Sequence, residues 1–189
     1  MPKIAVLISG GGSNLQSIID AIENKQLNCE ISIVIADREA TGLNRAEKHG
    51  IKNLLVDKSI YKKQLTQEIF KNIPKDTDLI VLAGYLSILD GEITKEWPNK
   101  IINIHPSLLP KFGGKGMYGM NVHKAVLEAK ERQSGCTVHY VNAGIDTGDI
   151  IKQSFVPVFL SDSAQDLQKR VLEEEHFTLV EVLKELLNN

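Results

Sequence analysis

Two polar side chains interrupt a short apolar run in the second half of the chain. The run is IINIH at residues 101–105, followed at once by PSLLP, and it carries Asn103 and His105. Side chains two apart on a strand share a face, so we expect this pair to point one way and the isoleucines the other. An amide N–H can stabilise an oxyanion, and an imidazole exchanges protons near neutral pH. The pair therefore suits a carbonyl carbon that becomes tetrahedral, although two structurally satisfied polar groups remain the alternative.

A carboxylate lies downstream in the turn sequence NAGIDTGDII, residues 142–151. Asp146 is the only carboxylate in NAGIDTG, the part of this segment that joins two predicted strands. A carboxylate there can hold a protonated imidazole or accept a proton from an attacking amine. A solvated turn aspartate is the alternative.

A glycine-rich segment, SGGGSN at residues 9–14, separates an apolar run from a helical pattern. Glycines allow the backbone to approach a ligand, and a helix N-terminus offers free N–H groups to an anion. Leu15 occupies the third glycine position of a dinucleotide fingerprint, and the Lys-Ser/Thr of a P-loop is missing, so we predict a monophosphate site. A tight turn capped by Ser13 or Asn14 is the alternative.

The remaining histidines have no partners at a metal-ligand spacing, so we expect no metal. We interpret them as structural; they are His49, His123, His139 and His176.

Alternating elements must position these residues. Apolar runs at 3–8, 30–36, 53–56, 78–84 and 101–105 read as strands, and helical patterns fall between them, including 42–49 and 61–73. Two further strands at 135–141 and 149–158 flank the Asp146 turn. A helix is expected to start near Val122, and another fills 163–187 behind a Ser or Asp cap. This order predicts an α/β fold: a Rossmann-like, open, mainly parallel twisted sheet with helices on both faces. Ligands are expected at the carboxyl ends of its strands, where LAGYLSIL at 82–89 follows the fourth one.

Composition indicates an ordinary globular protein. The 189 residues are 42% hydrophobic and 24% charged, with a net charge of −2, which gives no reason to expect a nucleic-acid or membrane surface. Cys29 and Cys136 lack a paired spacing, so we expect reduced thiols in a cytoplasmic protein. The N-terminal apolar run is too short for a signal peptide.

Four motifs together resemble a known family. VLISGGGSNLQSIIDA, DLIVLAGYLSIL, IINIHPSLLPKF and GIDTGDII occur in the order and spacing of the phosphoribosylglycinamide formyltransferases, and the similarity runs from Lys3 to the last helix. The resemblance implies the formyltransferase fold and formyl transfer in purine biosynthesis. The formyl group would pass from 10-formyltetrahydrofolate, a co-substrate, to the amine of glycinamide ribonucleotide. The expected partners are these small molecules, and the sequence makes no prediction of oligomeric state.

The resemblance also implies one domain over residues 1–189, with a phosphate- and nucleotide-binding half at 1–100 and a catalytic and folate-binding half at 101–189. Asn103, His105 and Asp146 become the catalytic trio. The ribonucleotide would contact Gly12, Ser13, Asn14 and Glu175. The folate would contact Asn103, Lys58, Leu86, Ser87, Ile88, Leu89, Val141, Asn142, Ala143, Gly144 and Ile145.

The chain departs from the family pattern near the phosphate. Leu172 stands where a glutamine can assist the phosphate, and Lys115, in the glycine-rich stretch at 112–123, is a candidate replacement. The rivals are a formyltetrahydrofolate hydrolase, a methionyl-tRNA formyltransferase and a non-catalytic nucleotide-binding module. We expect none of them. The hydrolase usually carries an extra N-terminal domain, the tRNA enzyme needs a C-terminal RNA-binding domain, and the module needs no Asn-His-Asp set.

Overall fold

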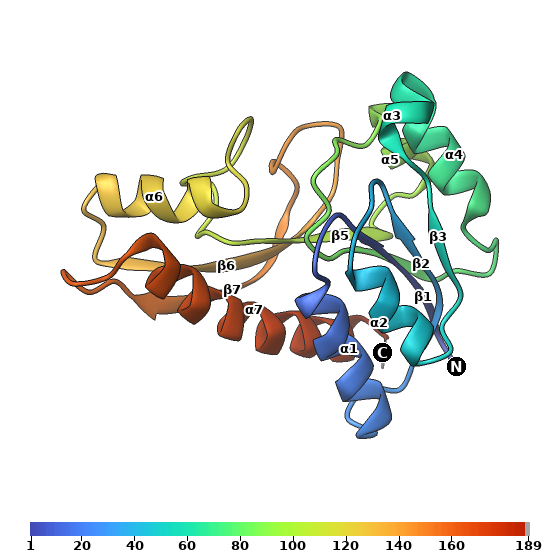
Figure 1. Ribbon diagram of the computed structural model, residues 1–189, viewed down its shortest axis with the longest axis horizontal. Coiled ribbons are helices and arrows are strands. Elements are labelled where there is room, and N and C mark those ends of the chain that lie inside the picture. Colours follow the sequence, from blue (N-terminus) through green and yellow to red (C-terminus); the bar gives the residue numbers. More distant parts are fainter. Residues whose placement is uncertain (188–189) are drawn as a thin grey trace.

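Seven strands form one open sheet in the computed structural model, which describes residues 1–187 (Figure 1). The strands are β1 (Lys3–Ile8), β2 (Glu30–Ala36), β3 (Asn53–Leu55), β4 (Leu79–Leu82), β5 (Ile101–His105), β6 (Gln133–Tyr140) and β7 (Ile150–Pro157). The helices are α1 (Ser13–Glu23), α2 (Gly42–Lys48), α3 (Lys58–Tyr61), α4 (Leu65–Asn72), α5 (Gly91–Glu96), α6 (Met120–Glu128) and α7 (Ala164–Leu187), with a 3-10 turn at η1 (Lys62–Gln64).

The strand order decides where a ligand can enter. The sheet runs β3-β2-β1-β4-β5-β6-β7, with β1 to β5 parallel and β6 and β7 antiparallel, which confirms the expected mainly parallel sheet. The chain leaves β1 toward β2 on one side and returns to β4 on the other. The crevice outside the carboxyl ends of β1 and β4 is therefore the switch point at which open α/β sheets bind ligands.

Helices cover both faces of the sheet. In Figure 1, α1, α2 and α7 lie below it, and α3, α4 and α5 lie above its right-hand part. Ile102 and Ile104 belong to the core shared with α1 and α7, whereas Ile101 belongs to the core shared with α4. The prediction that all three isoleucines face away from Asn103 and His105 was therefore wrong for Ile101. Residues 101, 103 and 105 lie two apart and share one face.

The helix predicted over residues 61–73 is shorter in the structure. Lys62 has a φ of 48°, which interrupts helical geometry, and α4 begins only at Leu65. The sequence reading missed α5, which Asp90 caps by accepting a hydrogen bond from the N–H of Glu92 at 3.0 Å.

The last helix follows the prediction. Ser163 Oγ accepts from the N–H of Asp166 at 3.2 Å, and Asp166 Oδ2 accepts from the N–H of Ser163 at 2.9 Å, a reciprocal cap. Its buried side includes Leu167, Val171 and Leu183, which pack on the sheet and on α1. Within residues 1–187, no helix has the length and apolarity to cross a membrane.

Candidate active site

A cavity of about 610 Å³ opens at the carboxyl ends of β1, β4 and β5. Its walls come from the glycine-rich segment 10–14, the segment 82–89, the end of β5, the loop 114–119, the turn 141–146 and three positions of α7. The switch point and the shared direction of the parallel strands thus bring together segments far apart in the sequence. Nearly every predicted site residue reaches this one space.

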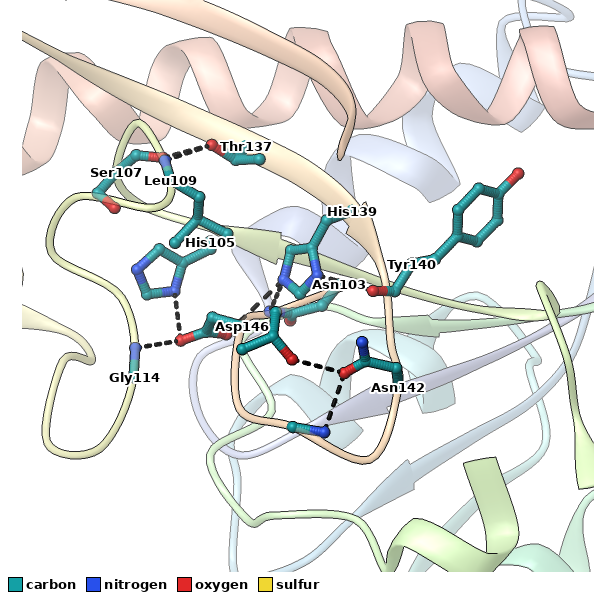
Figure 2. Close-up of polar contacts among 12 residues, drawn as sticks. Asn103, His105, Ser107, Leu109, Gly114, Thr137, His139, Tyr140, Asn142 and Asp146 are labelled. Carbon is teal, nitrogen blue, oxygen red and sulfur yellow. Dashed lines mark hydrogen bonds and ion pairs between the residues drawn. The ribbon is translucent and has the colours of Figure 1, made fainter. Parts of the chain in front are cut away.

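The predicted trio meets inside the cavity. His105 is 4% exposed, and its Nε2 lies 2.8 Å from the carbonyl oxygen of Phe112. Because a carbonyl only accepts, Nε2 carries a hydrogen and donates it. Nδ1 faces Asp146 Oδ2 at 3.6 Å, which is too long for a direct hydrogen bond but short for a charge interaction. Figure 2 shows the Asp146 carboxylate between His105 on one side and His139 on the other.

Asp146 is not a solvated turn residue. Its side chain is 12% exposed, and Oδ2 accepts a hydrogen bond from the N–H of Gly114 at 2.9 Å. The backbone of Asp146 has a φ of 55°, in the left-handed region that aspartate tolerates better than most residues. The turn is held from within by Asn142 Oδ1, which accepts from the N–H of Gly144 at 2.9 Å and from Thr147 Oγ1 at 2.8 Å. The turn therefore points one carboxylate into the cavity.

The other end of the cavity contains the start of α1. The N-terminus of α1 has no side-chain cap, so its first N–H groups are available to a ligand. Gly12 has a φ of 68°, and a Cβ there would lie 2.9 Å from the Cα of Gly42. The absence of a side chain at Gly12 thus serves packing against α2 and a left-handed turn. Gly10 and Gly11, the other two glycines of this segment, have open space beside them: a Cβ on either would meet nothing within 4 Å.

A buried acid borders the α1 end of the cavity. Glu175 is 7% exposed, and Asn14 Nδ2 donates to its Oε2 at 2.8 Å. Burial raises the pKa of Glu175 to about 7, against the lowering effect of the Asn14 hydrogen bond. Asn14 Oδ1 is buried and has no partner in the described chain. The pair therefore presents acceptor oxygens, which suit ligand groups that donate, such as hydroxyls.

Two further histidines stay neutral in this site. Burial, followed by the charge of His105, lowers the pKa of His123 to about 4. Burial also lowers the pKa of His139. Neither of these two rings therefore brings a positive charge to Asp146 at neutral pH. No group of three or more His, Cys, Asp or Glu side chains within residues 1–187 is arranged to hold a metal ion.

The comparisons with known proteins agree with this geometry. The model of the family described as formyl transferase matches residues 2–183. The chain belongs to the formyl transferase family.

Individual relatives show how far the likeness extends. The phosphoribosylglycinamide formyltransferase of Haemophilus influenzae is 39% identical over 182 residues, covering 93% of this chain and 82% of that protein. The chloroplastic phosphoribosylglycinamide formyltransferase of Arabidopsis thaliana is 40% identical over 188 residues, covering 96% of this chain. The chain spans 64% of the length of that relative and 60% of the Vigna unguiculata relative. The crystal structure of glycinamide ribonucleotide transformylase 1 from Symbiobacterium toebii superposes with a TM-score of 0.89 at 39% identity, covering 97% of this chain and 86% of that one.

The sequence alone did not predict the role of His139. Its Nδ1 lies 2.9 Å from the carbonyl oxygen of Tyr140, so Nδ1 donates, and Nε2 is left as an acceptor. Nε2 lies 3.1 Å from Asn103 Nδ2 and 3.7 Å from Asp146 Oδ1. The neutral ring therefore accepts one amide hydrogen of Asn103 and leaves the other for a ligand. Position 139 lies directly opposite position 103 in the β5–β6 pair, and only that register reveals the contact.

Two of the predicted folate contacts do not line the cavity. Lys58 begins α3, and its N–H donates to the carbonyl of Asp37 at 2.8 Å. Ala143 packs near Gly91 instead: a Cβ added to Gly91 would lie 3.1 Å from the Cβ of Ala143. Both contacts remain predictions to which the cavity adds no support. The other predicted folate contacts, in segments 86–89 and 141–145, line the wall.

A second buried acid was also missed. Asp37 is fully buried at the end of β2, and its carboxylate accepts from Arg38 Nε at 2.9 Å and from Ser87 Oγ. Burial raises the pKa of Asp37, but hydrogen bonds from Arg38, Ser87 and Ser9 outweigh it and bring the pKa below its ordinary value. Ser9 Oγ also accepts from the N–H of Leu86 at 2.8 Å. Asp37 thus ties the glycine-rich segment to the segment 86–89.

Proposed function

We propose that the protein transfers the formyl group of 10-formyltetrahydrofolate to the amine of glycinamide ribonucleotide. The observation that carries this proposal is that one cavity holds both the uncapped N-terminus of α1 and the Asn103–His105–Asp146 set. A phosphorylated amine and a formyl donor can therefore meet in one space. The names of the relatives point to the same reaction.

The ribonucleotide is expected at the α1 end. Its phosphate would accept hydrogen bonds from the N–H groups that begin α1, beside Gly11 and Ser13. Its ribose hydroxyls would donate to Glu175 and to the unpartnered Asn14 Oδ1. The amine would then extend toward Asp146.

The folate is expected along the more apolar wall. Leu86 and Ile88 are 43% and 66% exposed, so a flat ring system can cover apolar surface that is otherwise in water. Val141 and Ile145 line the same part of the cavity from the turn that carries Asp146. The formyl group would lie between these two walls, next to Asn103 and His105.

The chemistry begins when the substrate amine attacks the formyl carbon. A carbon–nitrogen bond forms, and the carbonyl electron pair moves onto oxygen. The free amide hydrogen of Asn103 and the protonated Nδ1 of His105 stabilise that oxyanion. The 3.6 Å gap to Asp146 leaves Nδ1 able to donate to the substrate.

Asp146 then completes the transfer. Its carboxylate favours the charged imidazole and accepts the amine proton, directly or through one water. When the carbonyl re-forms, the bond from the formyl carbon to the folate nitrogen breaks, and that nitrogen takes up a proton. The products are N-formylglycinamide ribonucleotide and tetrahydrofolate.

One assay tests the proposal. The protein is mixed with 10-formyltetrahydrofolate, with and without glycinamide ribonucleotide, and tetrahydrofolate release is followed. Release that depends on the ribonucleotide is expected. Equal release in its absence would identify a hydrolase, and no release would leave a binding module; either result overturns the proposal.

We place the protein in the cytoplasm on its thiols alone, and this location stays a prediction.

A further inference from the structure

Lys115 is the one lysine or arginine side chain on the cavity wall within residues 1–187. Among residues 1–187, no other lysine or arginine lines this cavity, whereas Asp146 and Glu175 both do. Lys115 is exposed, and the described chain offers its ammonium no hydrogen bond or ion pair. Because the two carboxyl groups repel an anionic ligand, the ammonium of Lys115 is the group on this wall that can attract it.

Within residues 1–187, Lys115 is the one lysine or arginine that lines the cavity; Arg45, which donates to the carbonyl oxygen of Gly11 at 2.7 Å, does not line it. A phosphate monoester carries about −1.5 to −2 charges at pH 7. A helix N-terminus supplies the equivalent of about +0.5. The α7 side chains facing this end are Gln168, Leu172 and Glu175, of which two are uncharged and one is an acid. A second positive charge on the cavity wall would balance more of the phosphate charge than the helix end balances alone.

The loop that carries Lys115 can supply it. In this glycine-rich loop, residues 113–119, Gly114 and Gly116 have φ angles of 89° and 85°, and a Cβ on either would meet no atom within 4 Å. The loop therefore stands clear of the core at Gly114 and Gly116, whereas Gly113 packs against Leu109. It leads into α6, which packs against α7, the helix that carries Leu172 and Glu175. At its other end, the Gly114 N–H holds Asp146.

We propose that the Lys115 ammonium binds the phosphate of the ribonucleotide from the glycine-rich loop, opposite the N-terminus of α1. This inference rests on the proposed function and names a specificity residue for the same site. Lysine acts on phosphate as a point charge and needs no fixed fork of donors, so a side chain on an exposed loop is suited to the task. When Lys115 contacts the phosphate, the neighbouring Gly114 is also held in place. The N–H of Gly114 in turn holds the Asp146 carboxylate.

Kinetics with two amine substrates test this contact. Lys115→Met is compared with wild type on glycinamide ribonucleotide and on the riboside that lacks the phosphate. We expect kcat/KM for the ribonucleotide to fall roughly tenfold to hundredfold. The kcat/KM for the riboside and the KM for 10-formyltetrahydrofolate should stay unchanged, and Lys115→Arg should recover part of the loss. Lys124→Met, an exposed lysine of α6 that does not line the cavity, is the matched control.

Several outcomes would overturn the contact. They are an equal loss on both amine substrates, which marks a structural role; a rise in the folate KM alone, which places Lys115 at an anionic group of the folate; and no change. Failure of the wild-type protein to formylate either amine would instead refute the proposed function. In that case, calorimetry with ribose 5-phosphate still decides the matter. Weaker binding to Lys115→Met than to Lys124→Met supports the contact, and equal binding refutes it.

Discussion

Replacing Asp146 by asparagine removes one charge from the centre of the site and keeps the shape of the side chain. The amide oxygen of asparagine can still accept from the N–H of Gly114, so the glycine-rich loop should stay anchored. The amide has no charge to stabilise protonated His105 and no basicity to take the amine proton. The substitution therefore separates the electrostatic role of Asp146 from its structural role.

The size of the effect follows from the distance between His105 Nδ1 and Asp146 Oδ2. Two unit charges 3.6 Å apart interact by about 1 kcal/mol at the dielectric constant of water and about 5 kcal/mol at an effective value near 20. With about 1.4 kcal/mol for each factor of ten, the rate should fall roughly tenfold to several thousandfold. Because Asp146 is only 12% exposed, the upper part of that range is expected.

Tetrahydrofolate release by Asp146→Asn should show the loss in kcat, with little change in ribonucleotide affinity, because the lost interaction develops in the transition state. Asp149→Asn is the matched control: Asp149 lies in the same segment, is exposed and does not line the cavity. Thermal unfolding of both variants reports on the fold. A rate within about threefold of wild type in a folded Asp146→Asn protein would refute the mechanism and return Asp146 to a structural role.

Three more changes probe the rest of the site. Glu175→Gln should raise the free energy of unfolding at pH 8 by up to about 3 kcal/mol, measured by urea unfolding. The reason is that burial raises the pKa of Glu175 in the folded protein from 4.5 to about 7. Ionised Glu175 therefore destabilises the folded protein fully above pH 7 and not at all below pH 4.5. A stabilisation independent of pH would contradict this. Gly11→Ala should weaken ribonucleotide binding, measured by calorimetry, without loss of stability. Gly12→Ala should lower the melting temperature, measured by thermal unfolding. Equal melting temperatures of the two variants would argue against the packing role of Gly12. His139→Phe removes the acceptor that orients Asn103 and should lower kcat about tenfold or more with intact ribonucleotide binding, and an unchanged kcat would remove His139 from the mechanism.

Several parts of this protein were predictable from the sequence because they depend on short spacings. Apolar runs and helical periodicity identified the seven strands and most helices. The two-residue spacing placed Asn103 and His105 on one face, and the glycine-rich segment marked the uncapped start of α1. The same reasoning missed α5 and the break at Lys62, where local backbone geometry rather than hydrophobic pattern decides.

The tertiary structure decided what those residues face. The strand order puts the ends of β1, β4 and β5 side by side, and no local pattern reveals the order of strands in a sheet. The antiparallel register sets His139 opposite Asn103, which turned an apparently structural histidine into the partner that orients the amide. Asp146 lies beside His105 although 41 residues separate them in the sequence. Asp37, at the end of β2, connects the glycine-rich segment 9–14 with the segment 86–89. Composition and spacing along the chain determine which groups are present, but their burial and their partners, and hence their charge and basicity, arise only when distant segments pack together.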